Sequence, residues 1–144
     1  MPHTARIIEA LGGATVVGRR VRSRDQLADR LRAGLPYSTF ESLLRLLNVP
    51  RRVLASTLHL TGRTLARRKR EGRLAPVESN RVYRLARVFA HAVDVFDDRQ
   101  KATVWFGRPN QALGGRTPLS VLDTDIGVQE VDEILGRIEH GIFS

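Results

Sequence analysis

The 144-residue sequence predicts an all-α protein, and two observations lead to that fold class. Apolar residues recur at spacings of three, four and seven along most of the chain, which is the period of one face of a helix. Residues that favour helix starts (Ser, Thr, Pro) and helix ends (Gly) flank these stretches. Cysteine is absent, so the sequence excludes disulfides and thiolate metal sites as supports of the fold.

The first third of the chain contains three amphipathic stretches with start and stop signals. They predict helices at residues 4–11, 23–33 and 38–47. Ser23 and Ser38 each stand three residues before a Gln or Glu, which is the spacing of a capping box. The run Ala14–Val17 shows weak alternation, and there we expect a loop or a short edge strand.

Two short helices follow in close succession. Pro50 favours the start of the first, and Thr61 can cap the second, which extends to Glu71 and ends at Gly72. Leu65 is the main apolar residue of the second helix, and basic side chains surround it. The short turn between the helices has the size found in a helix-turn-helix, where the second helix enters the DNA major groove with its N-terminus first.

The second helix of this pair provides candidate DNA contacts. The side chains nearest its start should face base edges, and they are Arg63, Thr64, Arg67 and Arg68. The side chains placed for phosphates are Lys69, Arg70 and Arg73. A basic helix that is only solvated is the alternative, but the turn between two helices favours nucleic acid.

After residue 75 the sequence changes character. Three more helices are expected, at residues 76–97, around 102–106 and at 124–141. The glycine-containing segment 108–118 is expected to be a loop. We therefore divide the chain into a DNA-binding domain, residues 1–75, and a second helical domain, residues 76–144.

The distribution of charge supports this division. The whole chain has a net charge of +9, with 24 Lys+Arg against 15 Asp+Glu. Residues 1–75 have a net charge of +11 and residues 76–144 a net charge of −2. The excess indicates an anionic partner, nucleic acid first and an anionic membrane surface as the alternative. No stretch is long and apolar enough to span a membrane, so we expect a cytoplasmic protein without a membrane partner.

The final helix and the tail have two unusual features. Gly127 and Gly136 lie inside the helix, where each costs about 1 kcal/mol relative to Ala. This favours a close backbone approach, either to another helix of the chain or to a partner. The chain ends in Ile142, Phe143 and Ser144, an apolar end that can insert into a partner's pocket or fold back on the chain.

Motifs for catalysis are weak in this sequence. The four histidines have no carboxylate or second histidine at metal-ligand spacing, and we expect His91 to be half-buried in the core. Gly114 and Gly115 could bind a phosphate, but two glycines in a loop indicate a turn first. We expect neither an enzyme nor a cofactor.

Four segments taken together resemble the Xre-type antitoxins of bacterial toxin–antitoxin pairs, the MbcA/ParS/Xre family. These segments are Leu58–Leu74, Glu78–Arg81, Asn110–Pro118 and Ile138–Ser144. The similarity covers roughly residues 35–144, and residues 1–34 match less clearly. It implies a helix-turn-helix domain of the Cro/Xre type, followed by a small helical toxin-binding domain, usually in a homodimer.

The resemblance also implies a partner and its contact residues. The cognate toxin would have a RES domain that consumes NAD or uses it to modify a target, and the antitoxin would cover the entrance of its active site. The residues implied for toxin contact are Asn110, Leu113, Gly114, Gly115, Arg116, Arg137, Glu139, His140, Gly141, Ile142, Phe143 and Ser144.

The sequence thus leads to the hypothesis of an antitoxin that also binds operator DNA and represses its own operon. The alternative is a freestanding helix-turn-helix regulator whose C-terminal domain only dimerises or senses a ligand.

Overall fold

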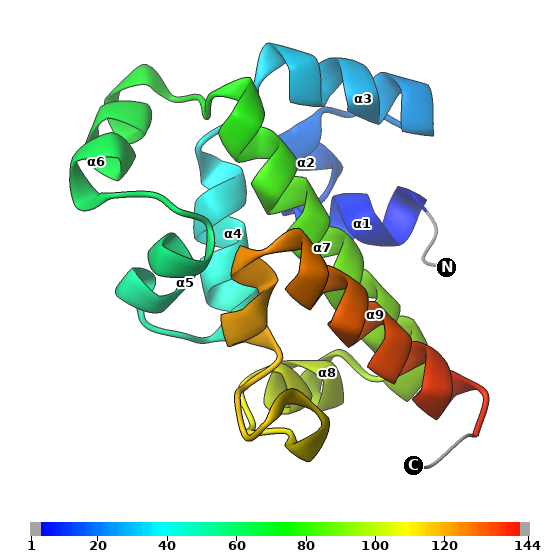
Figure 1. Ribbon diagram of the computed structural model, residues 1–144. Coiled ribbons are helices and arrows are strands. Elements are labelled where there is room, and N and C mark those ends of the chain that lie inside the picture. Colours follow the sequence, from blue (N-terminus) through cyan, green and yellow to red (C-terminus); the bar gives the residue numbers. More distant parts are fainter. Residues whose placement is uncertain (1–3, 142–144) are drawn as a thin grey trace.

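The chain is built from helices in the computed structural model, which describes residues 4–141 (Figure 1). In chain order the α-helices are α1 (Thr4–Ala10), α2 (Ala14–Val17), α3 (Arg24–Ala33), α4 (Ser38–Leu47), α5 (Arg51–Thr57), α6 (Gly62–Glu71), α7 (Pro76–Phe96), α8 (Arg99–Phe106) and α9 (Asp125–Glu139). The 3-10 helices η1 (Gln111–Leu113) and η2 (Leu119–Asp123) lie between α8 and α9. Residues 4–141 contain no strand, and the predicted all-α class is confirmed.

The long helix α7 lies at the centre of the fold. It contacts α1, α3 and α4 as well as α8 and α9, and Figure 1 shows it crossing the molecule with α9 beside it. Pro76 occupies its first turn. The Ala75 N–H donates a 2.9 Å hydrogen bond to Glu78 Oε1, which satisfies an amide group at the helix start. Asp97 ends the helix in the left-handed conformation, with φ 51°.

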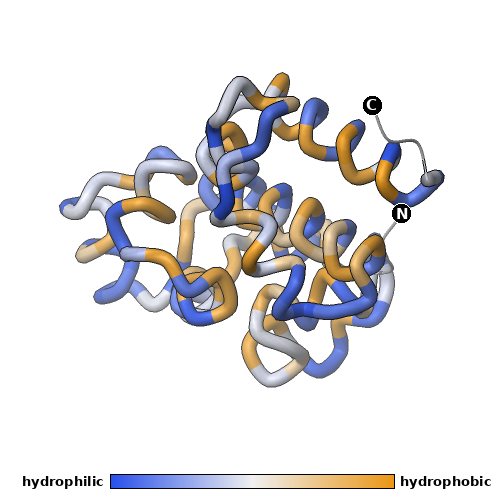
Figure 2. The backbone as a smooth tube through the Cα atoms, turned by 90° about the horizontal axis from the view of Figure 1, so that it is seen from below, coloured by the Kyte–Doolittle hydropathy of each residue, from blue (hydrophilic) through white to orange (hydrophobic). Residues whose placement is uncertain are grey.

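One connected group of buried side chains extends from α1 to α9. The largest fully buried members include Leu11, Phe40, Phe89, Phe106 and Leu135. Hydrophobic and hydrophilic residues alternate along the helical turns in Figure 2, as in helices that bury one face. Because the buried group is continuous through α7, no break in packing marks the boundary at residues 75 and 76, and the division into domains stays a prediction.

The expectation of a loop or strand at Ala14–Val17 is wrong, because these residues form helix α2. The N–H groups of Val16 and Val17 donate to the Gly13 carbonyl oxygen at 3.1 and 3.0 Å. Gly13 and Gly18 bound the helix with φ of 84° and 133°, a region that glycine adopts without steric cost.

The two predicted capping boxes have different outcomes. At Ser23 the box is present, since its side chain accepts from the Gln26 N–H while the Gln26 side chain accepts from the Ser23 N–H. At Ser38 the prediction is wrong, because the Glu41 side chain turns elsewhere. It accepts hydrogen bonds from the Tyr37 hydroxyl at 3.1 Å and from Arg51 Nη2 at 3.0 Å.

Candidate functional site

Helices α5 and α6 form the pair that the sequence predicts. The Thr61 side chain accepts a hydrogen bond from the Thr64 N–H at 3.1 Å and so caps the start of α6. Leu65 is the buried residue of α6. Gly72 ends the helix with φ 78° and donates its N–H to the Arg68 carbonyl oxygen at 2.8 Å.

The outer face of α6 is basic and open to solvent. Arg63, Arg67, Lys69 and Arg70 are exposed, and Thr64 is half-buried near the helix start. None of these four cations has an ion-pair partner within residues 4–141. In Figure 1, α6 lies at the edge of the molecule, away from α9. Arg73, just after the helix, is also exposed.

Arg68 differs from these cations because it pairs within the fold, and its predicted contact with base edges stays a prediction. Its Nε and Nη2 atoms donate to the two carboxylate oxygens of Glu78 at 2.7 and 3.0 Å. Nη1 donates to Glu71 Oε1 at 3.0 Å. The side chains of Arg68 and Glu78 are only 16% and 10% exposed. Arg68 therefore attaches α6 to α7.

The two charges of this pair change each other's proton affinity. Hydrogen bonds from Arg68 to Glu78 and to Glu71 raise the pKa of Arg68. Burial of Glu78 opposes its ionisation, but the hydrogen bonds from Arg68 and from the Ala75 N–H outweigh burial and lower the pKa of Glu78. The pair is fully charged at neutral pH.

The turn between α5 and α6 makes a contact that the sequence does not predict. His59 has a left-handed backbone, φ 56°, and its Nε2–H donates a 2.7 Å hydrogen bond to the carbonyl oxygen of Asp123. Arg81 Nη1 donates to the Leu58 carbonyl oxygen at 3.3 Å. Helix α5 also packs against η2. The turn is thus in contact with both α7 and η2.

Segment 108–118 is a compact loop whose motif residues maintain its shape. The Asn110 side chain accepts from the Ala112 N–H at 2.9 Å, and the Asn110 carbonyl oxygen accepts from the N–H groups of Leu113 and Gly115. Gly114 and Gly115 have φ of 66° and 87°. Leu113 is only 1% exposed, so its side chain supports the loop from inside, and its contact with a toxin stays a prediction. Gly114, Gly115 and Arg116 are exposed.

Helix α9 is attached to α7 by a cluster of polar side chains. Arg87 Nη2 and His91 Nδ1 lie 2.7 and 3.1 Å from the carboxylate oxygens of Asp132. His91 Nε2 lies 3.7 Å from Glu139 Oε1. His91 is 7% exposed, so it is more deeply buried than expected. Burial opposes ionisation of Asp132, but His91 and Arg87 lower its pKa overall.

The two glycines of α9 have different surroundings. A Cβ atom at Gly127 would lie 1.7 Å from the Val121 carbonyl oxygen, whereas one at Gly136 would meet nothing within 4 Å. The predicted close approach is confirmed at Gly127, where η2 is the neighbour. At Gly136 no atom of residues 4–141 comes that close, and the approach of a partner there stays a prediction.

The C-terminal end of α9 contains the remaining candidate contacts. Arg137 is half-buried, and Glu139, His140 and Gly141 are exposed. The predicted contact residues Ile142, Phe143 and Ser144 lie outside the described residues.

Comparisons with known proteins match two parts of the chain. Residues 26–87 match a family model described as the antitoxin Xre-like helix-turn-helix domain. Residues 91–141 match one described as the antitoxin Xre/MbcA/ParS C-terminal toxin-binding domain. The antitoxin Xre of Yersinia enterocolitica is 37% identical over 120 residues, which cover 82% of this chain and 81% of that protein.

The chain belongs to the Xre/MbcA/ParS antitoxin family.

Two further matches agree with this assignment. The Prs ADP-ribosylating antitoxin of Sphingobium sp. is 27% identical over 124 residues, covering 79% of this antitoxin and 78% of that protein. A chain in the crystal structure of the M. tuberculosis MbcT–MbcA toxin–antitoxin complex has a TM-score of 0.54 and 25% identity, over 75% of this chain and 96% of that chain. The protein is thus an antitoxin of a toxin–antitoxin system, with a toxin-binding domain that we call the C-terminal unit, residues 91–141.

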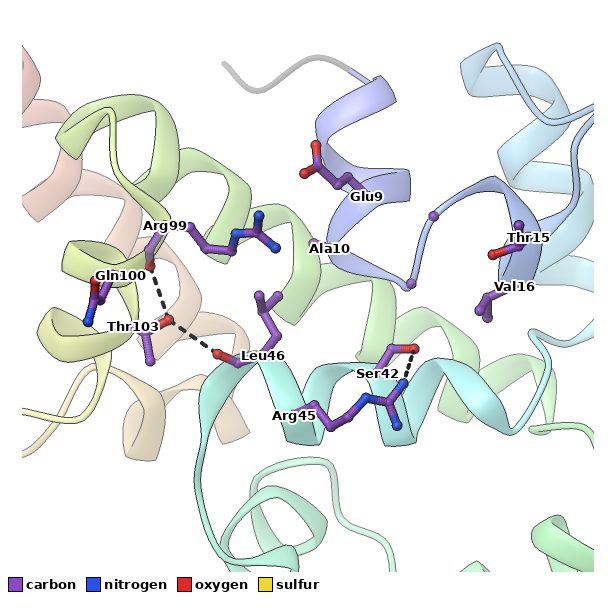
Figure 3. A pocket seen from close by; sticks show the side chains of 12 residues that line it. Glu9, Ala10, Thr15, Val16, Ser42, Arg45, Leu46, Arg99, Gln100 and Thr103 are labelled. Carbon is purple, nitrogen blue, oxygen red and sulfur yellow. Dashed lines mark hydrogen bonds between the residues drawn. The ribbon is translucent and has the colours of Figure 1, made fainter.

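The antitoxin also has a hollow beside α1 and α2, which precede the segments that the two family models match. About 790 Å³ of space lies between the α1–α2 turn and helices α4 and α8. Figure 3 shows Arg45 extending from α4, Arg99 from α8 and Glu9 from α1 around it. Among the described residues that line it, Glu9 is the one carboxylate.

Within residues 4–141, no three His, Asp or Glu side chains gather closely enough to hold a metal ion. In the same part of the chain, no helix combines the length and the apolar character that crossing a membrane requires.

Proposed function

We propose that this antitoxin represses its own operon through α6 and neutralises a RES-domain toxin through its C-terminal unit. The observation that supports DNA binding most strongly is the difference between the two sides of α6. Arg68 is paired with Glu78 inside the fold, whereas Arg63, Arg67, Lys69 and Arg70 face solvent without ion-pair partners in the described part of the chain. A row of unpaired cations on an exposed helix suits the phosphates and base edges of DNA.

Helix-turn-helix geometry divides these residues by role. Arg63, Thr64 and Arg67 lie toward the start of α6, which enters the major groove first, and we assign them to base edges. Lys69, Arg70 and Arg73 lie further along, and we assign them to phosphates. We propose that the antitoxin binds its operator as a homodimer, so that two α6 helices would contact half-sites roughly 34–36 Å apart.

Fluorescence anisotropy with a promoter fragment of the antitoxin's own operon, and with a scrambled fragment, tests these roles. Arg63→Ala and Arg67→Ala should each weaken operator binding by about 1–3 kcal/mol and affect scrambled DNA less. Arg73→Ala should weaken both fragments equally and reduce the slope of affinity against salt concentration. Equal losses on both fragments for all three variants would contradict base recognition.

The toxin-binding surface that we propose consists of loop 108–118, the C-terminal end of α9 and the tail. Gly114, Gly115 and Arg116 are exposed at the loop, and Glu139 to Gly141 are exposed at the helix end. A toxin that consumes NAD, or uses it to modify a target, must admit an anionic dinucleotide, so its pocket should be rich in hydrogen-bond donors. In this proposal the tail, with Ile142 and Phe143, would cover the entrance of that pocket and keep the dinucleotide out.

Deletion of residues 142–144 tests this blocking mechanism. Cells that produce the proposed cognate RES-domain toxin should lose NAD or growth when only the truncated antitoxin is present. Operator binding and dimerisation, measured by anisotropy and light scattering, should be unchanged by the deletion. Full protection by the truncated chain would contradict the role of the tail.

A further inference from the structure

Helix α6 has few contacts that determine its position. Leu65 is its buried residue, and the Arg68–Glu78 pair attaches the C-terminal part of the helix to α7. At the other end, α6 follows directly from the turn that contains His59. The position of the N-terminal end, which we assign to base edges, therefore depends on the conformation of this turn.

The 3-10 helix η2, in the C-terminal part of the chain, contacts that turn. His59 Nε2–H donates to the Asp123 carbonyl oxygen, 64 residues later in the chain, at 2.7 Å. Asp123 is the last residue of η2, and η2 packs against α5. The part of the chain matched as a toxin-binding domain thus contacts the helix-turn-helix at its turn.

Helix η2 is in turn closely attached to α9. The Val121 carbonyl oxygen occupies the space where Gly127 lacks a Cβ atom. Thr124, next to Asp123, accepts from the Gly127 N–H at 3.0 Å and caps α9. Because η2 also follows loop 108–118 directly, a change at either the loop or the start of α9 would move Asp123.

We propose that His59 and η2 couple the C-terminal unit to the DNA-binding helix, so that a displacement of η2 changes operator affinity. His59 is a positioning residue in this proposal, since it acts on DNA through the direction of α6. The proposal rests on the proposed DNA-binding function of α6.

A double-mutant cycle tests the coupling without any toxin. Gly127→Ala forces the Val121 carbonyl, and with it Asp123, away from its position. His59→Asn removes the Nε2–H donor, while Asn keeps a side chain that tolerates a left-handed backbone. Each variant alone should weaken binding to the promoter fragment by a factor of about 3 to 10, the value of one hydrogen bond.

The double variant distinguishes coupling from two separate structural losses. If η2 acts through His59, Gly127→Ala should have no further effect in the His59→Asn background. His59→Gln, which returns an N–H donor at the end of the side chain, should recover part of the affinity. Gly136→Ala is the matched control in the same helix, because a Cβ atom there meets nothing within 4 Å, and it should leave DNA affinity unchanged.

Different outcomes would contradict the coupling through His59 and the proposed DNA binding by α6. Circular dichroism identifies a variant that does not fold, and Thr124→Ala, which removes only the cap of α9, then replaces Gly127→Ala. If the losses of operator affinity of the two single variants multiply in the double variant, the two substitutions act independently. That result would overturn the coupling and would not contradict the proposed DNA binding by α6. Failure of the wild-type chain to bind the promoter fragment at low salt would instead contradict the proposed DNA-binding function.

Discussion

Arg68→Ala tests whether the basic residues of α6 belong to two groups, one inside the fold and one facing DNA. The substitution removes two hydrogen bonds to Glu78 and one to Glu71. Glu78 keeps the Ala75 N–H as a donor and is 10% exposed, so part of the lost interaction is replaced. Hydrogen bonds to charged groups contribute about 1.5–3 kcal/mol, and we expect a total loss of about 2–3 kcal/mol.

Thermal unfolding measures this loss, and Arg67→Ala is the matched control on the neighbouring residue. For a chain of this length the Tm of Arg68→Ala should fall by roughly 5–12 °C. Arg67 is exposed, so its replacement should change the free energy of unfolding by less than about 0.5 kcal/mol. An unchanged Tm for Arg68→Ala, together with a loss of operator affinity equal to that of Arg67→Ala, would refute the assignment of Arg68 to the interior.

Three other results are expected from the contacts described above. Asp132→Asn should lower the free energy of unfolding by about 1–2 kcal/mol in urea titrations, because the neutral amide cannot replace the charge that pairs with Arg87 and His91; an unchanged midpoint would contradict this. Leu113→Ala should lower the Tm and weaken toxin binding together, since the loop loses its buried side chain. Arg116→Ala removes only the hydrogen bond from Arg116 Nε to the Leu113 carbonyl oxygen, so it should lower the Tm less while weakening toxin binding, as isothermal titration calorimetry would show. The pKa values of Glu78 and Asp132 are lowered in the folded chain. Their contribution to stability is therefore complete above the ordinary carboxyl pKa of about 4 and is lost as the pH falls through the lowered values. Equal urea midpoints at pH 7 and pH 3 would contradict this expectation.

The elements that sequence reasoning predicts well are those set by neighbouring residues. Thr61 caps α6 through the amide three residues later, and Pro76 and Glu78 mark the start of α7 in the same local way. Such signals can be found in a few residues of sequence because the hydrogen bonds close within one helical turn. The helix pair that forms the helix-turn-helix was therefore predictable.

Contacts between distant residues could not be predicted in this way. Arg68 and Arg67 have the same side chain and similar neighbours in the sequence, and only the approach of Glu78 on α7 distinguishes them. The hydrogen bond between His59 and Asp123 joins residues 64 positions apart and leaves no pattern in either segment. The weak alternation of Ala14–Val17 suggested a loop or a short edge strand, but flanking glycines and packing against α1 and α4 accompany a helix there.

The central position of α7 has a consequence for the lifetime of the antitoxin in a cell. The two matched domains meet within this helix, at residues 87 and 91, and the helix has buried side chains along its length. A protease that cut within α7 would remove the support of α6 and of α9 at the same time. Degradation at this helix would therefore end the proposed repression and the proposed neutralisation together, and would not release one intact half with its own activity.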